Sequence, residues 1–240
     1  VNTDGRVFVW DIANRAKPRL VHSFATTATR FGLIAYSDDG QQFFVGSRGD
    51  SVALYDLSTG ERLLQLRVEM ETMTSLAWSR DKQMLIVGGK GGRLSLWHLE
   101  NGGLQPTEIS ATQMTAAAVD ALTFSPDGNK AASTHGVGDQ TVRLWSVDAQ
   151  AGLCLEHTLA GHTHIVWSAA FSPIPAQAGA EDSTATPLRL VTGSSDQTVR
   201  VWDVATGQSL YALHGQPRAL SALAIHQLRE PAIGESENVK

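Results

Sequence analysis

GSSDQTVRVWDVATG, residues 193–207, contains a nine-residue core that occurs twice in this chain. The core, DQTVRVWDV, returns as DQTVRLWSV at residues 139–147. Two explanations account for such a pair: a site that performs chemistry is present in two copies, or one structural unit is repeated along the chain. The rest of the sequence distinguishes between them.

Three further segments follow the same pattern with more substitutions. They are DGRVFVWDI ending at Ile12, GDSVALYDL ending at Leu57 and GGRLSLWHL ending at Leu99. The five aromatic positions, Trp10, Tyr55, Trp97, Trp145 and Trp202, are separated by 45, 42, 48 and 57 residues. Self-similarity with a period of about 40–45 residues is typical of repeat architectures, so the repeated segment is a structural unit.

Each period contains four short apolar runs separated by polar turns. The first run and the turn after it read LIAYSDDG, SLAWSRDK and ALTFSPDG in three of the repeats. In the Ser-Pro-Asp-Gly type of turn, Pro, Asp and Gly favour a hairpin. The runs are rich in β-branched and aromatic residues and predict strands, and no helical period competes with them. Sheets of four strands that are apolar on both faces must be covered by neighbouring sheets, which predicts a β-propeller rather than a two-sheet sandwich.

These residues resemble the WD40-repeat family. The Trp-Asp pairs at 10–11 and 202–203, the Gly161-His162 pair and the pattern GHTHIVWSAAFSP…LVTGSSDQTVRVWD carry the resemblance, which extends from residue 2 to about residue 226. It implies an all-β, WD40-type β-propeller, as a fragment or incomplete ring with about five repeats of four-stranded antiparallel blades. The repeats between residues 30 and 99 match less well and lack the Gly-His pair.

The repeats divide the chain into predicted blades. We expect a half blade at 1–25, blades at 26–67, 68–110, 111–160 and 161–214, the first strand of a further blade at 215–226, and a polar tail or linker at 227–240. Residues 174–187, IPAQAGAEDSTATP, replace a hairpin turn and are expected to form a surface loop. The chain begins inside a repeat, so we expect it to be a piece of a longer protein.

The resemblance also implies a buried structural network of His162, Thr192, Asp196 and Trp202. A buried indole N–H needs an acceptor, because leaving it unpaired costs roughly 1–3 kcal/mol. Only this repeat carries all four residue types. The repeat ending at Trp145 keeps Asp139, has Ser133 as the candidate equivalent of Thr192, and lacks the Gly-His pair.

Two chemical alternatives involve the same histidine. His162, Asp196 and a nearby serine could form a catalytic triad, but the turn-and-strand unit recurs where the histidine is absent, as a structural unit does and an active site does not. His162 and His164 could form half of a metal site, but no further cluster of ligands accompanies them. We therefore expect no catalytic residue, no metal and no cofactor.

Composition excludes several classes of partner. The net charge is −5, from 24 acidic and 19 basic residues, and no basic block supports binding to nucleic acid or to a membrane surface. No apolar run approaches the length that crosses a bilayer. Cys154 is the only cysteine, which excludes an intrachain disulfide framework and favours a reducing, cytoplasmic location.

The family resemblance implies a non-catalytic platform for a protein or peptide partner. The more specific expectation is a sensor or docking module of a larger signalling protein with a tethered effector domain. The alternative is a propeller accessory to a hydrolase or another enzyme whose catalytic domain lies outside this chain.

The candidate partner-binding residues lie where the predicted first strands begin and in the turns between second and third strands, which share one rim. Trp167 is the only aromatic residue among the equivalent starts, which alignment of the repeats places at Arg30 and Gly32, Thr74, Asp120, Trp167 and Ser221; the facing turns carry Arg48, Lys90 and Ser195. Trp dominates many interfaces, although Trp167 could instead fold over the adjacent repeat. The candidate set is Arg30, Arg48, Lys90, Asp120, Trp167 and Ser195.

Overall fold

The computed structural model describes residues 6–12, 14, 16–25, 33–37, 40–46, 51–70, 72–79, 81–100, 103–107, 116–172 and 187–214. The described residues form β-strands and turns, with one short 3-10 turn, η1 (Lys90–Gly92). This confirms the all-β class. The predicted further strand at 215–226, the tail at 227–240 and nearly all of the insertion at 174–187 lie outside the described residues.

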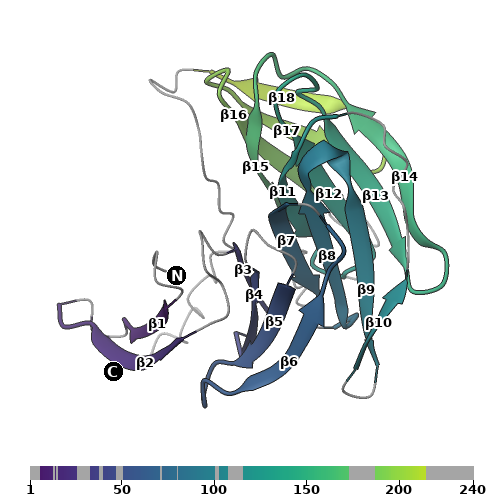
Figure 1. The fold of residues 1–240 in the computed structure, drawn as a ribbon. Helices are drawn as coiled ribbons and strands as arrows, with labels where there is room; N and C mark the ends of the chain where they lie inside the picture. Colours follow the sequence, from purple (N-terminus) through teal and green to yellow (C-terminus); the bar gives the residue numbers. More distant parts are fainter. Residues whose placement is uncertain are drawn as a thin grey trace, which may run out of the picture.

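The strands form one two-stranded and four four-stranded antiparallel sheets, which follow one another in chain order (Figure 1). Within each four-stranded sheet, every strand pairs with the next one along the chain. The strands, sheet by sheet, are β1 (Arg6–Asp11) and β2 (Arg19–Ala25); β3 (Leu33–Tyr36), β4 (Gln42–Gly46), β5 (Ser51–Asp56) and β6 (Arg62–Arg67); β7 (Met73–Ser79), β8 (Met84–Gly89), β9 (Leu94–Glu100) and β10 (Gly103–Thr107); β11 (Val119–Phe124), β12 (Lys130–His135), β13 (Val142–Asp148) and β14 (Gly152–Leu159); β15 (Val166–Phe171), β16 (Arg189–Ser194), β17 (Val199–Asp203) and β18 (Ser209–Leu213).

The hairpin between β11 and β12 shows how the repeated turn sequence sets the strand pairing. The Ser125 hydroxyl donates to Asp127 Oδ1 at 2.6 Å and accepts from the Lys130 backbone N–H at 2.9 Å. Gly128 adopts a φ of +68°, which glycine tolerates without steric cost. The side-chain bonds close the turn locally, so the two strands leave it in a defined register.

The core lies between consecutive sheets rather than within any one of them. In β8, Leu85 and Val87 face the preceding sheet, whereas Met84 and Ile86 face the following one. All six residues of β8 are buried. A strand that is covered on both faces has no side chains directed to solvent, which explains why MLIVGG contains no polar side chain.

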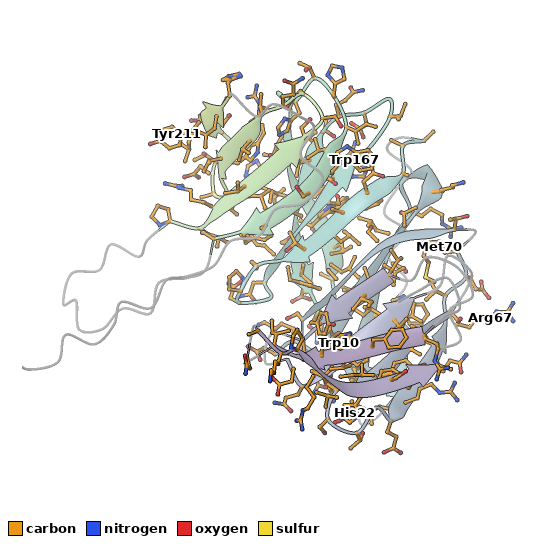
Figure 2. The ribbon with its side chains drawn as sticks, turned by 90° about the vertical axis from the view of Figure 1, so that its left-hand side faces the viewer. Trp10, His22, Arg67, Met70, Trp167 and Tyr211 are labelled. Carbon is orange, nitrogen blue, oxygen red and sulfur yellow. The ribbon has the colours of Figure 1, made fainter. Side chains whose placement is uncertain are left out.

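The first strands of the four complete sheets, β3, β7, β11 and β15, lie beside one another. The two-stranded sheet β1–β2 and the sheet β15–β18 stand at opposite ends of the row, as Trp10 and Tyr211 mark in Figure 2. The arrangement confirms the predicted propeller architecture of four-stranded antiparallel blades, incomplete in the described residues. It brings the starts of β7, β11 and β15 together along one rim.

Candidate functional site

The candidate site is the rim at which the first strands begin. Trp167, near the start of β15, is 40% exposed, and its indole N–H donates to Ser195 Oγ at 2.6 Å. Ser195 lies in the turn between β16 and β17, where its own N–H donates to the Ile165 carbonyl at 2.9 Å. The structure thus joins two predicted rim residues. The hydrogen bond ties the indole to the turn of its own sheet, although the residue is exposed; Figure 2 labels its position.

A local irregularity of the sheets presents the rim side chains. The register between first and second strands shifts at Thr74, at Asp120 and at Trp167, each time between the residues on either side. Such a β-bulge places one extra residue in a strand and redirects its side chain. Three neighbouring sheets therefore carry a bulge residue at the equivalent point of the same rim.

The three bulge residues make different contacts. The Thr74 hydroxyl donates to the backbone carbonyl of Val119 at 2.7 Å and so ties its sheet to the next one. Asp120 is half-buried, and its carboxylate lies over Gly136, where any added Cβ would collide with it. Burial raises the pKa of the Asp120 carboxyl above its usual value. Among the described residues, no hydrogen bond or ion pair holds this carboxylate.

The remaining rim candidates are less informative. Lys90 is exposed in η1, and its backbone N–H donates to the Thr72 carbonyl at 3.0 Å. Arg30 and Arg48 lie outside the described residues. The structure therefore brings Trp167 and Ser195 into contact, places Asp120 at the equivalent point of the neighbouring sheet, and leaves Lys90 in the corresponding turn of the sheet β7–β10.

The predicted structural network is joined by a chain of hydrogen bonds. The Trp202 indole N–H donates to Thr192 Oγ1 at 2.9 Å, Thr192 Oγ1 lies 2.8 Å from His162 Nε2, and His162 Nδ1 lies 2.8 Å from Asp196 Oδ2. Because Thr192 accepts from the indole, its proton points to Nε2, and Nδ1 then carries the proton that faces Asp196. Burial lowers the pKa of His162, against the opposing effect of Asp196.

Asp196 is the end of this chain and is strongly held. Burial raises the pKa of its carboxyl, but hydrogen bonds from Thr198, Thr163 and His162 outweigh burial and keep the pKa well below its usual range. The Thr198 hydroxyl donates at 2.6 Å and the Thr163 backbone N–H at 3.0 Å. The carboxylate therefore ties the loop before β15 to the turn after β16.

The order Thr192, His162, Asp196 is also that of a nucleophile, a base and an orienting acid. Geometry alone does not make it one. Thr192 is 0% exposed, and its oxygen already accepts from Trp202. A substrate has no route to that oxygen, so the arrangement acts as a tie between strand, loop and turn.

The neighbouring sheet contains a second network whose histidine comes from a different place. The Trp145 indole N–H donates to Ser133 Oγ at 2.9 Å, and Ser133 Oγ lies 3.0 Å from His135 Nε2. A buried ion pair joins Arg143 to Asp139 at 2.8 Å. Sequence reasoning missed His135 and Arg143. The available signal was spacing, because residues 133 and 135 share one face of a strand.

The His135 ring is more strongly affected by its surroundings than His162. Burial lowers its pKa to about 4, and Arg143 acts in the same direction, whereas Asp139 opposes it. The ring is therefore neutral in the folded protein near pH 7. Its Nδ1 atom has no hydrogen-bond partner among the described residues.

The described part of the chain shows neither a metal-binding cluster nor a membrane-spanning helix. It contains no group of three or more His, Cys, Asp or Glu residues arranged to hold a metal ion. His164, the second histidine of the considered metal pair, lies with its Nδ1 3.2 Å from the Thr163 hydroxyl. Within the same ranges, no helix has the length and apolar character needed to cross a membrane.

Comparison with protein families gives two matches. The family described as "Lipoprotein LpqB beta-propeller domain" matches residues 13–163, which is more than half of the chain. The family described as "WD domain, G-beta repeat" matches residues 153–203. The second range contains the repeat with the complete network, apart from its final turn and strand.

Curated relatives resemble this chain over part of their length. The Anaphase-promoting complex subunit cdc20 of Dictyostelium discoideum is 24% identical over 179 residues, 74% of this chain and 32% of that protein. The Nuclear distribution protein PAC1 of Komagataella phaffii is 26% identical over 110 residues, 46% of this chain and 20% of that protein. The Nuclear distribution protein PAC1-2 of Postia placenta is 37% identical over 73 residues, 28% of this chain and 17% of that protein. The chain thus spans about a third or less of each of these relatives.

Proposed function

Because this chain belongs to the WD40-repeat β-propeller family, we propose that it is a non-catalytic platform that binds a protein or peptide partner. Members of this family are generally interaction modules rather than enzymes. One of the relatives is named as a subunit of a complex. We place the binding surface on the rim that carries the bulge residues Asp120 and Trp167.

The observation that carries this proposal is the state of Trp167. Its ring is 40% exposed, yet the bond to Ser195 holds it in one orientation. An exposed aromatic side chain that is already ordered loses little conformational entropy on binding. Trp is also among the residues that contribute most to interface energies. The other reading, in which Trp167 merely covers the adjacent repeat, predicts that Trp167→Ala leaves partner binding unchanged.

The network of His162, Thr192, Asp196 and Trp202 has a structural role in this proposal. Thr192→Val removes the hydroxyl at nearly constant volume and leaves the Trp202 indole N–H without its acceptor. We expect the free energy of unfolding to fall by about 1–3 kcal/mol, with partner binding retained below the melting temperature. Thr158→Val, at an exposed position of β14, is the matched control. If the Thr192→Val protein were as stable as the parent but no longer bound the partner, the network would have a functional role and not only a structural one.

Affinity capture followed by quantitative mass spectrometry tests the rim. The immobilised chain is compared with Trp167→Ala, Lys90→Ala and Arg48→Ala variants, and thermal melting verifies that each variant is folded. Tyr211→Ala is the control, because Tyr211 is an exposed aromatic residue of the end strand β18. We expect a set of proteins that is lost with Trp167→Ala and retained with Tyr211→Ala. If all variants captured the same proteins equally well, the binding surface would not lie on this rim.

Three finer statements belong to the same proposal. We propose that the platform serves as the sensor or docking module of a larger signalling protein, that a tethered effector domain accompanies it in the full-length chain, and that it acts in the cytoplasm. The single cysteine, Cys154, supports a reducing compartment. Fractionation of cells that express the tagged full-length protein tests the location.

A further inference from the structure

Asp120 has an environment that is unusual for a carboxylate. It is half-buried, it sits at a bulge, and none of the described residues gives it a hydrogen bond or an opposite charge. The pKa of its carboxyl is raised by burial, and no neighbouring charge is among the causes. Withdrawing a carboxylate from water without a partner costs free energy, which a bound cation or donor would recover.

The backbone beside Asp120 is shaped around the carboxylate. Gly136 follows β12, and an added Cβ at this position would collide with an Asp120 carboxylate oxygen. The Gly136 N–H donates to the Ala118 carbonyl at 3.2 Å, so the glycine is fixed to the segment that leads into β11. The next residue, Val137, is 78% exposed and adds an apolar surface to the same turn. The half-buried Asp120 carboxylate thus lies against the backbone of this turn.

Trp167 occupies the equivalent bulge of the next sheet. The strands β11 and β15 lie beside each other, so the two bulge residues stand on the same rim in neighbouring sheets. A long side chain of a partner that lies along this rim would contact the carboxylate of one sheet and the indole of the next. An aromatic face attracts cations, and a guanidinium is planar enough to stack on it while donating two hydrogen bonds to a carboxylate.

We infer that Asp120 and Trp167 together form a recognition site for an arginine side chain of the partner, with the carboxylate accepting hydrogen bonds from the guanidinium and the indole stacking on it. The inference rests on the proposed function, because it assigns the partner chemistry of that same rim. Arginine is favoured over lysine because the ammonium group of lysine offers neither a planar face nor a bidentate fork. The acidic balance of the chain, −5 in net charge, is complementary to such a partner.

The test uses the peptide Ac-Gly-Gly-Arg-Gly-Gly-NH2 as the probe and the indole N–H resonances of the 240-residue chain as the readout. The chain has six tryptophans, and a Trp167→Phe spectrum identifies the resonance of Trp167. We expect this resonance to shift saturably with the arginine peptide. The same peptide with citrulline, which keeps the shape and loses the charge, should bind at least about tenfold more weakly, since hydrogen bonds between charged groups are the stronger ones.

Asp120→Asn should weaken binding of the arginine peptide by about tenfold or more and leave the citrulline peptide unaffected. Glu61→Gln is the matched control, because it removes one negative charge at an exposed turn away from the rim and should change nothing. Equal shifts with arginine and citrulline, or equal affinity in Asp120→Asn, would overturn the inference. If capture of partners still depends on Trp167 in that case, the proposed function stands and only the arginine assignment fails.

Discussion

Trp202 and Trp145 occupy equivalent positions on β17 and β13, and each indole N–H donates to a hydroxyl on the preceding strand. The two networks then differ. His162 reaches Thr192 from the loop before β15, whereas His135 reaches Ser133 from within β12 itself. The requirement that a buried donor be paired is the same in both sheets. The histidine that contacts the acceptor hydroxyl comes from a different position in each sheet. The hydrogen bond from the tryptophan to that hydroxyl is present in both.

The low pKa of His135 predicts how the protein responds to acid. The histidine titrates at about 6.5 in the unfolded chain and about 4 in the folded protein. Above pH 6.5 both states are neutral and the residue has no effect on stability. Between pH 6.5 and 4 only the unfolded state takes up the proton, so the free energy of unfolding falls by about 3 kcal/mol over this window. Urea titrations at several pH values measure the slope.

The matched variant for this prediction is His135→Gln, which removes the titration and retains a polar side chain. Its stability should depend less on pH between 6.5 and 4, whatever its stability at pH 7. His162 contributes in the same direction, because burial lowers its pKa too. A variant with the same slope as the parent protein would show that His135 is accessible to protons in the folded state.

At the scale of elements, the turns that follow the third strands of two sheets share one hydrogen-bond pattern. In the turn between β5 and β6, Asp56 accepts from the backbone N–H groups of Ser58 and Thr59, and the Gly60 N–H donates to the Asp56 carbonyl at 2.9 Å. In the turn between β17 and β18, Asp203 accepts from the Thr206 N–H, and the Gly207 N–H donates to the Asp203 carbonyl at 2.8 Å. The Asp of the Trp-Asp pair at 202–203 therefore serves the turn, while the Trp serves the core.

Gly207→Ala should destabilise the protein more than Gly40→Ala. Both glycines have a left-handed backbone, with φ of +70° and +66°, which costs a non-glycine residue about 1 kcal/mol. An added Cβ at Gly40 would meet nothing within 4 Å, whereas at Gly207 it would lie 2.8 Å from the His157 ring. We expect a loss of about 1 kcal/mol for Gly40→Ala and a clearly larger loss for Gly207→Ala. Chemical denaturation of both variants provides the measurement.

His157 cannot readily yield to the added methyl group, because its Nε2 lies 3.1 Å from the Ala205 carbonyl in the same turn. This contact joins β14 to the turn of the following sheet. Equal losses for the two variants would show that His157 moves aside and that the contact between the sheets contributes little.

At the scale of the whole molecule, stability depends on the number of covered faces. The three sheets from β3 to β14 each contribute to two core clusters, whereas β1–β2 and β15–β18 each contribute to one. Phe8 and Trp10 remain exposed on the open face of the first sheet, and all five residues of β18 are exposed. In stacked repeats the energy is roughly a sum over neighbouring interfaces, so among the described residues the two end sheets have one such contribution fewer than the others.

Hydrogen exchange followed by mass spectrometry should reveal this gradient. We expect the slowest exchange in β8 and β12 and the fastest in β1, β2 and β18, since local opening is easiest where fewest apolar contacts are broken. The matched comparison is β14 against β18, because both are fourth strands of their sheets. Equal protection of these two strands would mean that the end face of the last sheet is covered in solution.

The repeat period, the strands and the turns could be read from the residue pattern, because each depends on neighbours in sequence or on a motif that recurs. The Trp202 network is predicted from the resemblance to the WD40-repeat family. The residue pattern does not predict three other features: the role of His135, the bulges at Asp120 and Trp167, and the contact between Trp167 and Ser195. Each depends on cross-strand register and on how one sheet packs against the next. Local patterns decide which residues form a strand and which form a turn. Whether a buried or half-buried side chain has a hydrogen-bond partner depends on which strands, distant in sequence, pack around it. The lack of a partner for Asp120 among the described residues is therefore visible only in the folded protein.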